Sequence, residues 1–174
     1  KKAEGMQFWT KEEFDQFIKD LKVIISKPLD ATCGQGVMKL SKDDFESTKD
    51  LYDFLLENNS GLAEECVVQH DALSEIYPHS VNTYRIVTVL TEGKPNVVYA
   101  FIRIGNGGRF VDNINSGGMA APIDIETGVI QFAAFDKDSI YYETHPETSC
   151  MIKGYALPFW KESLDLVLKA ATVV

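Results

Sequence analysis

The stretch VIISKPLDATCGQGVMKL, residues 23–40, has the pattern of a strand, a loop and a second strand. The β-branched run at residues 23–25 favours an extended chain that ends at Lys27-Pro28, and an extended pattern resumes at Val37. The loop between the two runs contains glycines, which adopt backbone conformations that other residues rarely take. The stretch therefore predicts a strand–loop–strand unit in the first part of the chain.

The residue types around this loop suit a phosphate group. Lys27 stands at the end of the first strand, and Gly34 and Gly36 lie in the loop. Glycines let backbone N–H groups approach an anion closely, while a lysine supplies a point charge. The spacing is not that of a Walker A loop, which requires GxxxxGK[ST] before a helix. The residues alone leave two interpretations open: half of a nucleotide-phosphate clamp, or a hairpin loop with a lysine that faces solvent.

The composition is that of an ordinary folded protein with an acidic balance. The chain has 174 residues and a formal net charge of -9, which argues against a protein that grips nucleic acid. No window approaches the roughly 20 apolar residues that span a bilayer, and the N-terminus lacks the apolar core of a signal peptide. We therefore expect a soluble, cytoplasmic chain with no membrane span and no nucleic-acid partner.

The first third of the sequence predicts two helices around the strand–loop–strand unit. Thr10 and Glu13 form a capping box ahead of an apolar helical face, so a helix is expected over residues 10–22. Ser41 can cap a second helix that continues to about residue 58. These elements predict a small αβ lobe over residues 1–66.

The remainder, residues 67–174, predicts a mixed and mostly antiparallel sheet that helices flank. Hairpins are expected at TEGKPN and IETGVI, where Gly93 and Gly128 can take positive φ. An amphipathic helix is expected in the closing stretch PFWKESLDLVLKAATVV. The expected strands are LAEECVV, TYRIVTVL, NVVYAFIRIG, a short GRFV, MAAPIDI and VIQFAAFD. The predicted fold class is α+β.

The stretch LAEECVVQHD, residues 62–71, combines an apolar strand start with acids. Backbone groups at a strand end can pair with the edge of a nucleobase, and a later carboxylate such as Asp71 can accept hydrogen bonds from ribose hydroxyls. An edge strand with solvated acids at Glu64 and Glu65 explains the same residues. Both interpretations stay open at this point.

Two arginines and one loop complete the candidate residues. Arg85 and Arg103 interrupt apolar strands, so they either offer donors to a phosphate or carboxylate or form structural salt bridges. The loop GNGGRFVDNINSGG, residues 105–118, either surrounds a ligand, with Asn113 supplying an amide, or is a long turn. The histidines are scattered and no nucleophile motif is present; among the cysteines only Cys33, inside the first loop, is a candidate for reactivity.

The order of these features resembles that of the ATP-grasp superfamily, and most closely its branch associated with sugar transfer and cell-surface polysaccharide biosynthesis. Individually the matching segments are loose, but they are collinear at compatible spacings over most of the chain. The segments are FWTKEEFDQFI, KPLDATCGQGV, AEECVVQH, SVNTYRIVT, AFIRIG, VDNINSGGMAAPIDIETG and PFWKESLDLVLKAA.

The resemblance implies a role for each candidate residue. Lys27 matches the lysine that contacts the α and β phosphates of ATP, and Gly34 and Gly36 match the loop that closes over them. Asp71 stands where the family has a ribose-binding acid. The remaining matches are the adenine hinge, at Glu64, Glu65 and Val67, and the residues of the carboxylate-amine ligase branch, Arg85, Arg103 and Asn113.

The resemblance also implies a reaction, in which a carboxylate attacks the γ-phosphate of ATP and the acyl phosphate then yields to an amine, a thiol or a similar nucleophile. The family's Mg²⁺ ligands lie in a motif expected beyond residue 174, so no metal ligand is assigned within the chain. On this basis we expect a fragment, truncated before the metal-ligand motif and inactive alone, of an ATP-dependent ligase. The alternative is a non-catalytic module that binds a nucleotide or another protein.

Overall fold

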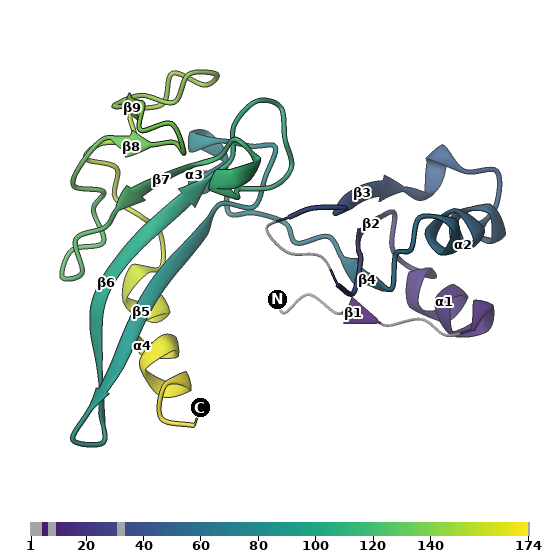
Figure 1. The fold of residues 1–174 in the computed structure, drawn as a ribbon, viewed down its shortest axis with the longest axis horizontal. Helices are drawn as coiled ribbons and strands as arrows, with labels where there is room; N and C mark the ends of the chain where they lie inside the picture. Colours follow the sequence, from purple (N-terminus) through teal and green to yellow (C-terminus); the bar gives the residue numbers. More distant parts are fainter. Residues whose placement is uncertain (1–4, 7–9, 31–33, 174) are drawn as a thin grey trace. The chain divides into compact units, whose positions relative to one another are not determined.

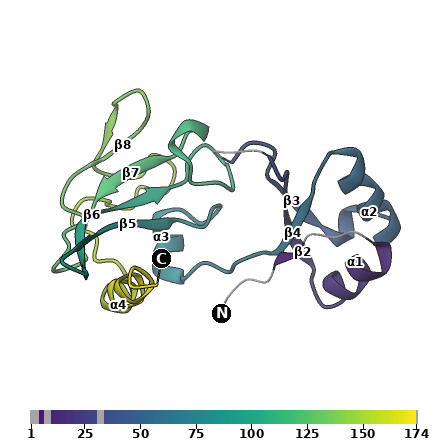
Figure 2. The ribbon, with the colours of Figure 1, turned by 60° about the horizontal axis from the view of Figure 1, so that its bottom comes forward.

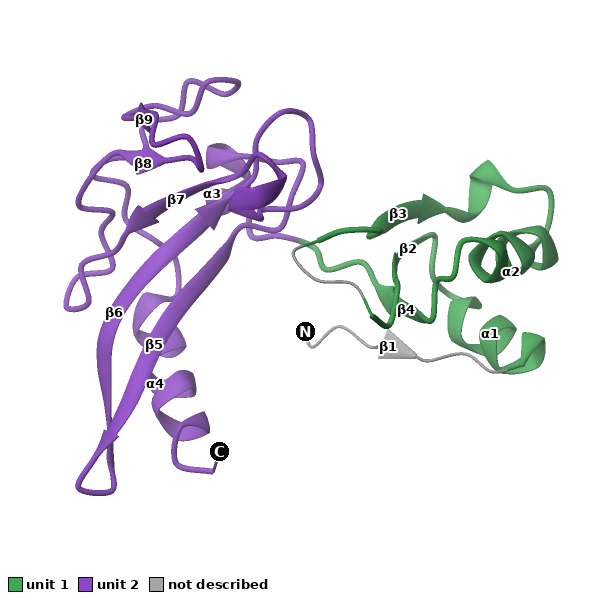
Figure 3. Cartoon of the chain, viewed as in Figure 1, with its two compact units in different colours: residues 1–68 green, residues 69–174 purple. Residues whose placement is uncertain are grey.

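The computed structural model describes residues 5–6, 10–30 and 34–173. The chain divides into two compact units, residues 1–68 and residues 69–174 (Figure 3). Each unit combines an antiparallel sheet with helices (Figure 1). The α+β class predicted from the sequence is therefore confirmed.

The first unit is built on a four-stranded antiparallel sheet with the strand order β1-β4-β2-β3. Its elements are β1 (Gly5–Met6), α1 (Lys11–Ile18), β2 (Val23–Lys27), β3 (Met38–Ser41), the 3-10 helix η1 (Lys42–Asp44), α2 (Thr48–Glu57) and β4 (Leu62–Glu65). The predicted capping box is present, since Thr10 Oγ1 accepts a hydrogen bond from Glu13 N at 3.1 Å and the Glu13 carboxylate accepts one from Thr10 N at 3.2 Å. The helix that this box begins ends at Ile18 rather than at residue 22.

The helices α1 and α2 pack on one face of this sheet. Ile24 and Ser26, at alternate positions of β2, are fully buried on that face. The apolar cluster there consists of Phe14, Ile18, Ile24, Leu51, Leu55 and Ala63. Because side chains alternate along a strand, Ile25 and Lys27 point to the opposite face. This alternation places Lys27 on the face of the sheet that the helices leave uncovered.

The single helix predicted from Ser41 to about residue 58 is wrong in its middle. Ser41 caps only η1, and Phe45 then returns to an extended conformation with φ -125° and ψ 145°. Ser47 starts α2 by accepting a hydrogen bond from Asp50 N at 3.2 Å. A serine hydroxyl competes for backbone donors wherever it can serve as a cap, so two serines in one window produced two helices.

The second unit is built on a five-stranded antiparallel sheet in which the strands follow chain order, β5-β6-β7-β8-β9. Its elements are α3 (Asp71–Ile76), β5 (Thr83–Thr91), β6 (Lys94–Ile104), the 3-10 helix η2 (Ile114–Ser116), β7 (Met119–Pro122), β8 (Ala134–Phe135), β9 (Tyr141–Tyr142) and α4 (Trp160–Ala170). The hairpin predicted at TEGKPN joins β5 to β6. Its two turn residues, Glu92 and Gly93, both have positive φ, at 53° and 76°, as a tight hairpin turn requires.

The helix α4 covers the apolar face of the β5–β6 hairpin (Figure 2). Trp160 is almost fully buried, and its ring meets that of Tyr84 edge-on at a centroid distance of 5.9 Å. The indole N–H donates to the carbonyl of Ile125 at 2.8 Å, and a Cβ at Gly128 would lie 2.4 Å from the indole ring. Gly128, with φ 73°, is therefore a glycine both for its turn and for the tryptophan that packs on it.

The other predicted strands are shorter than expected, and one is absent. The segment GRFV, residues 108–111, forms no strand, and VIQFAAFD contributes only the two residues of β8. Ile130 instead makes an isolated bridge with Ile123. The short helix α3 was missed, because its six residues follow a strand-like run. Within the described part of the chain, no helix combines the length and the apolar character that a membrane crossing needs.

Candidate functional site

The predicted clamp loop follows β2 in the first unit. Gly34 and Gly36 have φ values of 77° and 67°, which other residues rarely adopt. A Cβ at Gly36 would lie 2.6 Å from Cγ of Pro28, so the loop also closes on itself there. Cys33 lies outside the described residues. The loop thus has glycines at positions where the backbone needs them.

Lys27 is paired with one of the two predicted hinge acids. Its ammonium donates to the Glu64 carboxylate, and the two side chains are 38% and 29% exposed. In the β2–β4 ladder Lys27 faces Leu62 and Glu64 faces Ile25, so the ion pair is diagonal on the face that the helices leave uncovered. The structure therefore brings together two residues to which the sequence gave separate roles. Lys27 is solvated enough to reach a ligand without leaving the sheet.

The other predicted hinge residues, Glu65 and Val67, lie at the end of β4 and beyond it. Glu65 is the last residue of the strand and faces Ile24 in the ladder. Val67, which lies beyond the strand, is 45% exposed, and Val68 is 93% exposed. Asp71 belongs to the second unit, where it is the first residue of α3, and its side chain is exposed. The expected strand over residues 62–68 is therefore correct only to Glu65.

Arg85 and Arg103 lie on the same face of the second sheet. Thr83 is directly opposite Arg103 and Arg85 is directly opposite Phe101, so the two arginines are diagonal neighbours, at a spacing of roughly 7–8 Å. This face is opposite the one that Tyr84 and its neighbours pack against the core. The pair thus offers two guanidinium groups on the surface away from α4.

The two arginines differ in their surroundings. Arg103 is only 17% exposed, and its Nη2 lies 2.9 Å from Oδ1 of Asp112. Arg85 is exposed and has no hydrogen-bond or ion-pair partner among the described residues. The sequence left open whether both arginines are structural or both face a ligand. The structure gives one largely buried, paired arginine and one exposed arginine that has no partner among the described residues.

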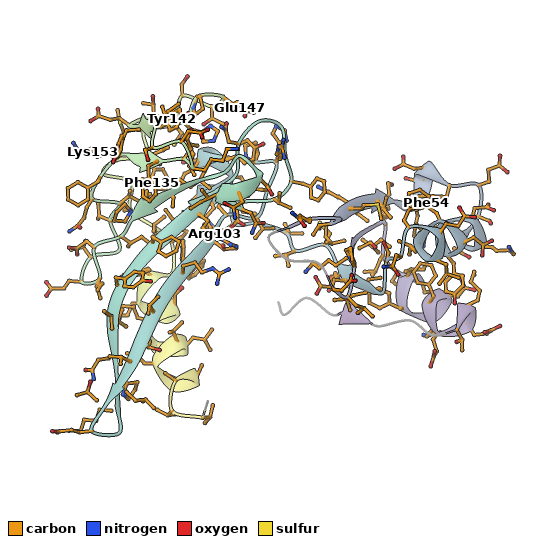
Figure 4. The ribbon with its side chains drawn as sticks, in the orientation of Figure 1. Phe54, Arg103, Phe135, Tyr142, Glu147 and Lys153 are labelled. Carbon is orange, nitrogen blue, oxygen red and sulfur yellow. The ribbon has the colours of Figure 1, made fainter. Side chains whose placement is uncertain are left out.

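The loop over residues 105–118 is held at several points by the rest of its unit (Figure 4). Gly105 N donates to Oδ1 of Asn82 at 3.1 Å, and the Tyr77 hydroxyl donates to the carbonyl of Arg109 at 3.0 Å. Gly107 N donates to the carboxylate of Glu147. A Cβ at Gly105 would lie 2.3 Å from Ser80 Oγ, so this position also excludes a side chain. The loop is therefore anchored rather than being a free turn.

A buried histidine supports the same loop. His145 is 1% exposed; its Nδ1 accepts from Glu147 N at 3.2 Å, which assigns the ring proton to Nε2 and makes that atom a donor to the carbonyl of Gly105 at 3.0 Å. Tyr77 stacks on the imidazole at a centroid distance of 5.0 Å, and its burial raises the pKa of the Tyr77 hydroxyl. Sequence reasoning assigned no role to His145, and its contacts here are those of a structural residue.

Asn113 begins the short helix η2 at the end of this loop. Its carbonyl accepts hydrogen bonds from Ser116 N at 2.9 Å and Gly118 N at 3.0 Å, and its side chain makes no capping hydrogen bond. A Cβ at Gly118 would lie 2.5 Å from the carbonyl oxygen of Asp112, and Gly117 has φ 91°. The paired glycines therefore permit the close backbone approach between Gly118 and Asp112.

Thr83 and Asp112 were missed by sequence reasoning, although both touch a predicted site residue. Thr83 Oγ1 accepts from Nε of Arg103 at 3.1 Å and donates to Oδ2 of Asp112 at 2.5 Å. The signal that could have found them is the requirement that a guanidinium in an apolar strand have a partner. The register of two long strands and the path of a loop decided which residues supply it.

The described residues contain no group of three or more His, Cys, Asp or Glu side chains that could hold a metal ion. The carboxylates discussed above are instead engaged with protein groups: Glu64 with Lys27, and Asp112 with Arg103 and Thr83.

The chain was compared with known proteins. The model of a protein family described as sugar-transfer associated ATP-grasp matches residues 7–174, which is nearly the whole chain. A comparison with curated protein sequences gives no significant match. The family match spans both units and includes every candidate residue discussed above. The chain belongs to the sugar-transfer associated ATP-grasp family.

Proposed function

We propose that this chain is the ATP-binding portion of an ATP-grasp ligase that activates a carboxylate as an acyl phosphate and acts in cell-surface polysaccharide biosynthesis. Membership of the family implies ATP binding and a ligase-like function. One observation supports the finer proposal most strongly. In an acidic chain, two arginines share an exposed sheet face, and one of them has no partner among the described residues. Such a pair suits a reaction between two anions.

ATP fits the residues of the first unit. In the proposed site Lys27 contacts the α and β phosphates, and the positive-φ backbone at Gly34 and Gly36 lets N–H groups approach them. Glu64, Glu65 and Val67 form the segment that would pair with adenine, and Asp71 would accept hydrogen bonds from the ribose. When bound, ATP supplies the phosphoryl group that the carboxylate takes up.

Lys27 can contact ATP without first breaking its ion pair with Glu64. Its ion pair with Glu64 is partly solvated, so water and phosphate oxygens can share the ammonium, which has three N–H donors. Glu64 would therefore hold Lys27 in place at a modest cost in competition for its charge.

Arg85 and Arg103 would act on the carboxylate and the transferred phosphoryl group. Both reactants are anionic, so their approach is opposed by repulsion that guanidinium groups reduce. Charge also builds on the phosphoryl oxygens during transfer, and preorganised donors stabilise it. Asn113, whose side chain makes no capping hydrogen bond, would add an amide donor.

Magnesium is typical of such reactions, but the described residues offer no group of three ligands for it. The proposed partners are therefore ATP and a carboxylate compound, and the proposed location is the cytoplasm. The proposed ligase forms an amide, a thioester or a related bond from the acyl phosphate.

A hydroxylamine trap tests this function. Full-length protein is incubated with ATP, Mg²⁺, hydroxylamine and a panel of carboxylates, because hydroxylamine displaces phosphate from an acyl phosphate to give a hydroxamate. We expect ADP and hydroxamate to form together with at least one carboxylate, and Arg85→Ala to lower the rate by about 100-fold or more. Lys94→Ala, which removes a cation at the start of β6, is the matched control and should leave the rate unchanged. ATP binding without carboxylate-dependent ADP formation would instead favour the non-catalytic module.

A further inference from the structure

Thr83, Arg103 and Asp112 form a closed ring of two hydrogen bonds and one ion pair. Arg103 donates from Nε to Thr83 Oγ1 at 3.1 Å, and its Nη2 is ion-paired with Asp112 Oδ1 at 2.9 Å. Thr83 Oγ1 donates in turn to Asp112 Oδ2 at 2.5 Å. Each member therefore touches both of the others, and both carboxylate oxygens of Asp112 are used within the ring.

The ring joins three separate segments of the unit. Thr83 opens β5, Arg103 lies directly opposite it near the end of β6, and Asp112 comes from the loop before η2. Asp112 is 5% exposed, and a Cβ at Gly118 would lie 2.5 Å from its carbonyl oxygen. Asn113, the next residue, is thereby placed beside the same ring. The ring fixes the loop to the sheet at the edge of the candidate site.

The ring leaves part of the guanidinium unused. An arginine has five N–H donors in a planar fork. The hydrogen bond to Thr83 uses the donor at Nε, and Nη2 is held by the ion pair with Asp112, while Nη1 makes no hydrogen bond with the described residues. Because the two contacts are made at different nitrogens, they restrain the plane of the fork, and binding loses little side-chain entropy.

The charges on this face are divided between the two arginines. Asp112 balances the charge of Arg103, so the ring as a whole is close to neutral. Arg85, its diagonal neighbour, is exposed and has no counter-charge within the part of the chain that the structure describes. Arg103 thus provides donors in a fixed direction, and Arg85 provides electrostatic attraction.

We propose that Thr83 and Asp112 are positioning residues, which orient Arg103 so that its remaining N–H donors meet the phosphoryl or carboxylate oxygens of the reactants. This proposal rests on the function proposed above and adds two residues to it. If the ion pair of Arg103 and Asp112 were purely structural, it would stabilise the loop whatever the direction of the remaining Arg103 donors. The two roles therefore predict different effects of variants that still fold.

The test compares Thr83→Val with Thr83→Ser in the full-length protein. Valine keeps the β-branched shape that suits β5 but neither accepts from Arg103 nor donates to Asp112, whereas serine keeps the hydroxyl. In the hydroxylamine assay we expect Thr83→Val to lower kcat about tenfold or more with KM for ATP nearly unchanged, and Thr83→Ser to recover most of the loss. Urea unfolding of each variant establishes that it is folded under the assay conditions.

A second measurement does not depend on turnover. The Nε–H resonance of Arg103, assigned with Arg103→Lys in a nitrogen-15 spectrum, is followed while inorganic phosphate is added. We expect phosphate to shift this resonance in wild type and in Thr83→Ser, and at least tenfold more phosphate to be needed in Thr83→Val. Asp112→Asn, which unbalances the charge of Arg103 while keeping the shape, should broaden or move the resonance before phosphate is added.

The outcomes separate the two proposals. If wild type forms no hydroxamate but phosphate still shifts Arg103 in a manner that depends on Thr83, the proposed ligase function fails and the positioning role stands. If wild type is active and Thr83→Val matches it in kcat and in the phosphate titration, the positioning role is overturned and the ligase function stands. A shift confined to the Nε–H of Arg85 would likewise overturn it.

Discussion

Lys27 and Glu64 form an ion pair across the β2–β4 ladder, although the residue directly opposite Glu64 is Ile25. Both side chains are partly exposed, at 38% and 29%. An ion pair in this setting is screened by water and contributes little to folding. The pair is therefore better explained as a means of holding a lysine in one place than as a source of stability.

Loss of this ion pair should have little effect on the stability of the protein. Lys27→Met should lower the free energy of unfolding by less than about 1 kcal/mol, because exposed pairs contribute about 0.2–1 kcal/mol. Urea denaturation measures the change. Lys49→Met is the matched control, since Lys49 forms a similarly exposed pair with Asp53 on α2. A loss of several kcal/mol for Lys27→Met alone would mean that Lys27 is a structural residue.

Truncation of the two arginines of the second sheet should change the free energy of unfolding by very different amounts. Arg103→Ala leaves the buried carboxylate of Asp112 without its cation, which typically costs about 3–5 kcal/mol. Arg85→Ala removes an exposed side chain without a partner among the described residues and should change stability by less than about 0.5 kcal/mol. Equal losses, measured by urea unfolding of both variants, would contradict the difference in their surroundings.

A side chain at Gly118 should displace the loop that carries Asp112 and Asn113. The new Cβ would lie 2.5 Å from the carbonyl oxygen of Asp112 and 2.9 Å from that of Ile104, and backbone atoms cannot move aside cheaply. We expect Gly118→Ala to cost about 1–3 kcal/mol or more. Gly107→Ala is the control: it has φ 70° but nothing within 4 Å of the new Cβ, so it should cost only about 1 kcal/mol. If the two variants are equally stable, the close approach at Gly118 is not real.

The stability of the second unit should depend on pH through Tyr155. Its hydroxyl oxygen lies 2.7 Å from the carbonyl oxygen of Ala72 and 2.8 Å from the carboxylate of Glu75, so the one hydroxyl proton is shared between two acceptors. Burial, and then the bond to Glu75, raise the pKa of Tyr155 to about 12, from an ordinary value of about 10. A raised pKa means that the folded state holds the proton more tightly, so this stabilisation is complete below about pH 10 and is lost as the pH rises through about 12.

Tyr155→Phe tests this dependence. The variant should be less stable than wild type by about 1–3 kcal/mol at pH 8, since it leaves both acceptors without the hydroxyl donor that they share. The difference between the two proteins, measured by urea unfolding, should shrink as the pH is raised above 10. A difference that stays constant up to pH 11.5 would show that the hydroxyl does not titrate in this range.

Local signals in the sequence predicted those elements that neighbouring residues decide. The box of Thr10 and Glu13 starts α1 as expected, and Gly93 takes the positive φ that closes the β5–β6 hairpin. The helix start at Ser47 and the break at Phe45 were missed, because a second potential cap nearby competed with the first. The absence of a strand at residues 108–111 has a different cause. Arg109 in that segment is tied to Tyr77, and Gly107 just before it is tied to Glu147, and both partners are far away in the sequence.

The candidate site likewise has features that local sequence predicts and features that depend on distant residues. That Lys27 ends a strand ahead of glycines is visible in the sequence, and so is the resemblance that orders the candidate residues. The pairing of Lys27 with Glu64, and the ring that Thr83 and Asp112 form with Arg103, depend on strand register and loop path. Register is decided by which face of each strand is buried across a whole sheet, and no short motif contains that information.

The affinity of the full-length protein for ATP, measured by calorimetry in wild type, Lys27→Met and Lys49→Met, tests the central claim most directly. A charge-assisted contact to phosphate contributes about 1.5–3 kcal/mol, so Lys27→Met should weaken binding by about 10- to 100-fold. Lys49→Met, which loses a comparable ion pair on α2, should bind ATP as wild type does. Equal affinities for all three proteins, or no binding of ATP by wild type, would contradict the assignment of Lys27 and its loop as the phosphate clamp.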